Sequence, residues 1–344
     1  MNATTLPASH ILAIPVLEPE RLFGSPDAIT GVYHALAKRW HPDLPDGDAT
    51  VFAHIGQLVE RAKHLATIGM WHLPGVFEFT AGGKQYRVRY LRAFAFELGQ
   101  VLFGKTRLTY VIRQEFADQA ANGRTIIEGL RYPDAKTGEV MRRYLPKVME
   151  FQETATHVIV SIEKPIDLIR LRDLLTFSDG KLDPRHVAWM VSRMLNLASY
   201  LENQKLCHHD FSLDTLFVCP EHHSLSLLGG WWYAAAAGSS LKGKLLPART
   251  IANAPSGLIT TKIATLRTDP ELVRLTGREL LGDASGISLA RNPDIRPEIA
   301  NWLRMSGTGS AMEDFTVWFD KALGKRRFVV LPVKANDVYP ELLT

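Results

Sequence analysis

The sequence predicts an α+β protein: a small helical module, then a β-rich region, then a mostly helical region. Apolar residues recur at helical spacing over residues 20–66, and they alternate with polar residues over 76–113, where Ala81–Gly82–Gly83 predicts the turn of a β-hairpin. A helix is expected around 135–151, and from residue 164 helical patterns dominate, with short strands near 215–218 and 225–228. The predicted parts are a tail over 1–10, a helical module over 11–68, a β-rich lobe over 69–163 and an α-rich lobe over 164–344.

The composition is that of a globular protein, with 46% hydrophobic and 22% charged residues among 344. No run of about 18 apolar residues is present, so we expect no membrane span. The first ten residues lack a basic segment followed by an apolar run, so we expect no signal peptide. The two cysteines, Cys207 and Cys219, form no C-x-x-C pair, which argues against a zinc ribbon. We therefore expect a cytoplasmic protein without a cofactor.

The helical module is predicted to be two antiparallel helices joined by a polar loop. Ser25 is a suitable N-cap, and Pro26 suits the first helical position. Pro42 ends this helix because proline has no backbone N–H and clashes with the preceding turn. Each helix has one apolar stripe, made of Ile29, Tyr33, Leu36 and Trp40 in the first and of Phe52, Ile55, Val59 and Ala62 in the second.

The loop between these helices resembles the J domain of DnaJ-like co-chaperones, over roughly residues 11–66. The resemblance rests on the tripeptide His41–Pro42–Asp43, on the basic end of the preceding helix and on the spacing of the apolar residues after the loop. In that family the tripeptide and the basic helix face contact a DnaK-type chaperone ATPase and stimulate its hydrolysis. The resemblance implies this chaperone-contact role for His41, Pro42, Asp43, Lys38 and Arg39. An ordinary helix–turn–helix containing the same tripeptide is the alternative.

Residues Gly99–Thr106 match the phosphate-loop pattern G-x-x-x-x-G-K-[ST], but the surrounding sequence does not fit it. A phosphate loop opens a helix, whereas residues 107–113 alternate like a strand. Bulky side chains also fill the loop at 101–103. A β-hairpin is therefore favoured, with Gly99, Gly104 and Lys105 kept as a minor phosphate-loop candidate. The two glycines also resemble a thinned kinase-type glycine loop.

The C-terminal half resembles a protein kinase, and the resemblance spans roughly residues 92–325. A helix with one apolar face is predicted over 183–202. It leads into Cys207–Val218, which is similar to the kinase catalytic loop H-R-D-x-x-x-x-N. His208 and Asp210 match this loop, and Thr215 stands in place of its asparagine. Asp269 begins a helix similar to the one whose aspartate holds the catalytic loop in kinases. The resemblance implies a two-lobed protein-kinase-like fold.

Two substitutions remove groups on which phosphoryl transfer depends. Leu228 occupies the position of the metal-binding aspartate of D-F-G, and an aliphatic side chain cannot ligate a hard cation. Strand 109–112 also lacks the lysine of V-A-I-K. We therefore expect a pseudokinase, whose degenerate site comprises His208, Asp210, Thr215, Leu228, Gly230 and Asp269.

The favoured function is that of a co-chaperone or adaptor, which recruits a DnaK-type chaperone and binds an unidentified protein client. An atypical kinase or nucleotide-binding protein that uses Lys105 and Asp210 is the alternative. A basic nucleic-acid-binding protein is the third hypothesis, from a net charge of +4 and a pI of about 9.0.

The histidines at 208, 209, 222 and 223 form no i,i+4 pair, so we expect no metal site. Trp231–Trp232–Tyr233 is expected to be core or an interface patch and not a platform for stacking bases.

Overall fold

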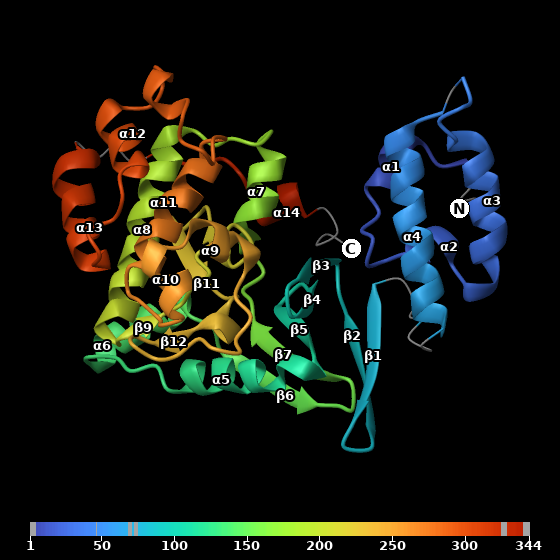
Figure 1. Cartoon of the computed structure of the whole chain (residues 1–344), viewed down its shortest axis with the longest axis horizontal. Coiled ribbons are helices and arrows are strands. Elements are labelled where there is room, and N and C mark those ends of the chain that lie inside the picture. The colour runs from blue at the N-terminus through green and yellow to red at the C-terminus, as the bar shows by residue number, and fades with distance from the viewer. Residues whose placement is uncertain (1–4, 46, 68–70, 72–74, 325–328, 340–344) are drawn as a thin grey trace. The chain divides into compact units, whose positions relative to one another are not determined.

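The computed structural model describes residues 5–45, 47–67, 71, 75–324 and 329–339. It shows a mixed α and β protein with several sheets (Figure 1). The chain divides into two compact units, of which unit 1 comprises Met1–Gln114 and Gln152–Ile159 and unit 2 comprises Glu115–Phe151 and Val160–Thr344. The boundary predicted between residues 68 and 69 lies outside the described residues.

The helices of unit 1 are α1 (Ala8–Leu12), α2 (Glu20–Phe23), α3 (Ile29–Trp40) and α4 (Ala49–Thr67), with a 3-10 turn at Pro26–Ala28. The predicted stripes form one core, in which Leu36 of α3 and Ile55 of α4 are fully buried. Phe52 is the exception, because it is only partly buried and packs against the His41 ring instead. α1 begins inside the stretch expected to be a loose tail, because Ile11 reaches the same core. The Ser25 side chain makes no capping bond at the 3-10 turn.

The strands of unit 1 begin with the predicted hairpin, β1 (Val76–Ala81) and β2 (Lys84–Arg89). Gly82 and Gly83 form its turn with φ of +54° and +74°, which glycine adopts without strain. Three antiparallel strands follow, β3 (Arg92–Phe96), β4 (Gly99–Phe103) and β5 (Arg107–Arg113). The favoured hairpin at the phosphate-loop match is therefore confirmed, because strand β4 is followed by strand β5 and not by a helix.

The sheet that contains β3 to β5 continues with β7 (His157–Glu163) and β6 (Val148–Glu153), in the order β3-β4-β5-β7-β6. The unit division assigns 152–159 to unit 1, so each of these two strands is shared between the units. The helix predicted over 135–151 is wrong in its second half, where β6 lies. Only α6 (Ala135–Met141) and a 3-10 turn at Arg142–Tyr144 are helical there.

Unit 2 is mainly helical and is organised around α8 (Pro184–Asn203). Asp183 caps α8 by accepting a hydrogen bond from the Arg185 N–H, and Pro184 takes the first helical position. The apolar face predicted for this helix is buried. α11 (Thr268–Leu280) and α13 (Ala311–Val317) pack along α8 (Figure 1). A Cβ on Gly277 would lie 2.7 Å from Leu303 Cδ2, so only glycine permits the observed approach.

The remaining helices of unit 2 are α5 (Ala117–Glu128), α7 (Leu171–Phe177), α9 (Ala248–Asn253), α10 (Ser256–Thr261), α12 (Pro297–Arg304) and α14 (Ala335–Val338). Two small antiparallel sheets also belong to the described part of this unit. In the first, β10 (Leu216–Cys219) lies between β11 (Ser224–Leu227) and β8 (Ile169–Arg170), and in the second β9 (Leu206–Cys207) pairs with β12 (Ala235–Ala236). Within the described ranges, no helix is long and apolar enough to cross a membrane.

Candidate functional site

The first candidate site is the loop between α3 and α4 of unit 1. α3 ends at Trp40, and His41 turns into an extended conformation with ψ of 131°, as expected for a residue that precedes proline. The Asp43 N–H donates to His41 Nδ1 at 3.3 Å. The His41 ring packs edge-on against Phe52 of α4, with 5.1 Å between ring centroids. These contacts fix the orientation of the tripeptide relative to both helices.

The tripeptide and its basic neighbours are accessible. The side chain of His41 is 45% exposed and that of Asp43 is 86% exposed, while Pro42, Lys38 and Arg39 are also exposed. Asp48 ends the loop by accepting hydrogen bonds from the N–H groups of Thr50 and Val51, which caps α4. The structure therefore brings all five predicted chaperone-contact residues to one end of the α3–α4 pair.

The second candidate site lies in unit 2, where Asp269 of α11 holds the segment that enters from β9. Its two carboxylate oxygens accept hydrogen bonds from the His208 N–H at 2.7 Å and from the His209 N–H at 2.8 Å. His209 has a φ of +65°, which is uncommon for a residue with a side chain. Its Nδ1 lies 2.9 Å from the Tyr233 carbonyl oxygen, and because that oxygen only accepts, Nδ1 carries the proton.

Backbone hydrogen bonds join this segment to residues 228–230. The Leu228 N–H donates to the Thr215 carbonyl oxygen at 3.0 Å. Within the segment, the Thr215 hydroxyl donates to the Asp210 carbonyl oxygen at 2.6 Å. Gly230 has a φ of +80°, and a Cβ there would lie 2.7 Å from His208 Cε1 and 2.9 Å from Asp210 Oδ2. All six residues predicted for the degenerate kinase site thus lie together.

The electrostatics of this second site are those of a protein interior. Burial lowers the pKa of His208 to about 3 and the pKa of His209 to about 4. Burial raises the pKa of Asp269 to about 6, although the two N–H donors act to lower it. At neutral pH both rings are therefore uncharged, and Asp269 is mostly ionised.

The second site is closely packed, which limits the chemistry that it can perform. Leu228 is 2% exposed and Asp210 is 8% exposed. Leu228 supplies no oxygen ligand for a cation, and Thr215 already donates its hydroxyl proton to a backbone carbonyl. The arrangement orders a buried loop.

Further residues that the sequence did not single out also support this loop. Arg249 donates to the Phe211 carbonyl oxygen at 3.0 Å and forms an ion pair with Glu279 at 2.7 Å. The Thr250 hydroxyl donates to the His209 carbonyl oxygen at 2.6 Å. No spacing in the sequence indicates these contacts, because their partners lie 30 to 41 residues apart.

The remaining predictions on single residues concern the phosphate-loop candidate and the aromatic triplet. Gly99 starts β4 and Gly104 follows it, and a Cβ on Gly99 would lie 2.1 Å from the Val111 carbonyl oxygen. Strand packing thus accounts for Gly99.

Trp231, Trp232 and Tyr233 are at most 1% exposed, which confirms that they belong to the core.

No protein-family model matches the chain, and a search of curated proteins finds no significant relative.

Proposed function

We propose that this chain is a co-chaperone or adaptor, in which the loop His41–Pro42–Asp43 recruits a DnaK-type chaperone. A kinase-like region that lacks phosphoryl-transfer chemistry would bind a protein client. The observation that carries the proposal is the exposure of the whole tripeptide at the end of an antiparallel helix pair. A tripeptide that only ended a helix would not need accessible histidine and aspartate side chains.

The charge beside the loop supports an acidic partner. Lys38 and Arg39 lie in the last turn of α3 and are both exposed. Cations at a helix C-terminus interact favourably with the helix dipole, and they also attract an acidic surface over several ångströms. This combination favours recruitment of an acidic ATPase surface over a purely structural turn.

Two observations support the kinase-like part of the proposal: the order of secondary-structure elements and the absence of a metal-binding carboxylate at position 228. Antiparallel strands precede a helical region, and the segment from His208 to Thr215 lies between α8 and β10. Leu228 is buried where a metal-binding carboxylate would be required. A domain with this site retains surfaces for binding but lacks the ligand set for Mg²⁺.

The test is the steady-state ATPase rate of a DnaK-type chaperone with the full-length chain added. We expect the chain to raise the rate several-fold and His41→Gln to abolish this increase. His34→Gln is the matched control, because His34 is exposed on the same helix and lies outside the loop. It should leave the stimulation unchanged.

Two results would contradict the proposal. The first is equal stimulation by the wild type and by His41→Gln. The second is absence of stimulation by the wild type with several different DnaK-type chaperones while circular dichroism shows that the chain is folded. Either result would leave the tripeptide as an ordinary helix end.

A further inference from the structure

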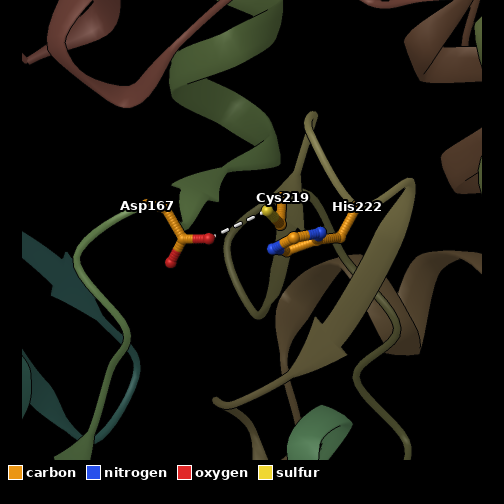
Figure 2. Close-up of side chains that lie close together, drawn as sticks. All are labelled: Asp167, Cys219 and His222. Carbon is orange, nitrogen blue, oxygen red and sulfur yellow. Dashed lines mark hydrogen bonds between the residues drawn. The ribbon is translucent and has the colours of Figure 1, made fainter.

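Three side chains that could bind a metal meet in unit 2 although they are separated in the sequence. Asp167 precedes β8, Cys219 ends β10, and His222 lies in the turn between β10 and β11. One ligand atom from each lies within 4.8 Å of the other two. Figure 2 shows the Cys219 sulfur facing the Asp167 carboxylate, with the His222 ring beside it. We propose that these three residues bind a zinc ion.

The donor set is the first argument for zinc. A thiolate, an imidazole and a carboxylate are all ligands that Zn²⁺ accepts, whereas Mg²⁺ and Ca²⁺ require oxygen ligands. A tetrahedral zinc ion with such ligands holds their donor atoms roughly 3.3–3.8 Å apart. The three donor atoms lie within 4.8 Å of one another and Cys219 Sγ lies 2.9 Å from Asp167 Oδ2, so zinc binding would require the exposed His222 side chain to adjust and the other two groups to separate slightly.

The contact between Cys219 and Asp167 is the second argument. The Cys219 thiol donates its proton in a hydrogen bond to Asp167 Oδ2 at 2.9 Å. Both groups bind a metal in their anionic forms, so one proton lies between two potential ligands. Zinc binding would break the S–H bond, form Zn–S and Zn–O bonds, and release that proton to solvent. The ion would then neutralise the two negative charges.

The local backbone is the third argument. Cys219 is the last residue of a strand and His222 follows it by three residues, so one tight turn carries both side chains.

The site would join two segments of unit 2. Asp167 belongs to the connection between β7 and β8, while the other two ligands belong to the β10–β11 hairpin. With three protein ligands, the fourth position of a tetrahedral ion would be taken by water. The ion would therefore tie the connection to the hairpin.

The experiment is a cobalt titration of the full-length chain after its tag has been removed and bound metal has been extracted by a chelator. Tetrahedral Co²⁺ bound to a thiolate gives intense visible bands and a sulfur-to-cobalt charge-transfer band. We expect one equivalent of Co²⁺ to bind with this spectrum and Zn²⁺ to displace it. Cys219→Ser should remove the charge-transfer band, because the other cysteine, Cys207, lies in β9.

The variants are chosen so that misfolding cannot explain the result. His222 is exposed, so His222→Ala should fold normally and weaken Co²⁺ binding at least ten-fold. Asp167→Asn should do the same, because it removes the charge and keeps the shape. The matched control is His223→Asn, which removes the neighbouring histidine and should change the affinity less than two-fold. A wild-type chain without the charge-transfer band, or equal affinities for His222→Ala and the wild type, would overturn the proposal.

Discussion

The chain contains two His-x-Asp loops with the same local hydrogen bond and opposite surroundings. In each, the aspartate N–H donates to the histidine Nδ1 at 3.3 Å, from Asp43 to His41 in one and from Asp210 to His208 in the other. The His41 side chain is 45% exposed, whereas His208 is fully buried against Trp231. The comparison teaches that the packing around such a loop, and not its sequence, decides whether the loop is exposed or forms part of the core.

The largest expected effect tests how tightly the buried loop is packed. Gly230→Ala should lower the free energy of unfolding by about 2–5 kcal/mol, because it combines an unfavourable positive φ with overlap against His208 and Asp210. Urea denaturation followed by tryptophan fluorescence measures this loss.

Gly180→Ala is the matched control for Gly230→Ala. Gly180 has the same φ of +80°, but a Cβ there meets nothing within 4 Å, so we expect a loss of only about 1 kcal/mol. Equal losses in the two variants would show that the loop around Gly230 is loosely packed.

The second effect is pH dependence of unit 2. The folded pKa values of His208 and His209 lie below the unfolded value of about 6.5. Their contribution to stability is therefore present above pH 6.5 and is lost as the pH falls toward 4. Between pH 7 and pH 5, each histidine should lower the free energy of unfolding by about 2 kcal/mol. Protonation of Asp269, whose pKa is raised, should restore about 1 kcal/mol of that loss.

A variant that keeps the backbone conformation tests this pH dependence. His209→Asn retains a residue that tolerates positive φ, and it should remove about 2 kcal/mol of the loss between pH 7 and pH 5. His34→Asn, at an exposed position outside the loop and the proposed metal site, should keep the full loss. Urea denaturation at both pH values compares the three proteins, and an unchanged loss in His209→Asn would mean that this ring is accessible to protons.

The third effect concerns the exposed loop. Lys38→Glu should slow association with a DnaK-type chaperone by about three- to ten-fold at low ionic strength, because it reverses a charge beside the tripeptide. The difference should shrink as salt is added. Surface plasmon resonance measures the association rate, and Lys63→Glu on α4 gives the same change in net charge away from the loop. Similar rates for the two variants would remove the role assigned to Lys38.

The smallest expected effect is the response to nucleotide. Mg·ATP should shift the melting temperature by less than about 1 °C, because Leu228 cannot bind the cation. A ligand at 100 times its dissociation constant would stabilise the chain by about 2.7 kcal/mol, which is readily detected. A clear upward shift that requires Mg²⁺ would favour the nucleotide-binding alternative.

Local patterns in the sequence were sufficient for elements that are stabilised along the chain. The apolar face of α8 and the turn Gly82–Gly83 were predicted because periodicity and turn chemistry act over a few residues. The pattern failed over 148–151, where pairing in the sheet overrides local helix preference and forms β6.

In the candidate sites, too, the sequence predicted contiguous residues but not contacts between distant ones. The tripeptide His41–Pro42–Asp43 is contiguous and was predicted directly, whereas the contacts of Arg249 depend on tertiary packing. The cluster of Asp167 and Cys219 was missed for the same reason, since 52 residues separate them. His222 was considered only with neighbouring histidines.

The most direct test of the comparison applies the same substitution to both loops. His41→Gln should change the melting temperature by less than about 2 °C and abolish stimulation of a DnaK-type ATPase. His208→Gln should lower the stability by about 2–3 kcal/mol, since it replaces a buried ring, and should leave stimulation by the folded chain intact. The account is contradicted if His208→Gln is thermally neutral, or if His41→Gln destabilises the chain and still stimulates the ATPase.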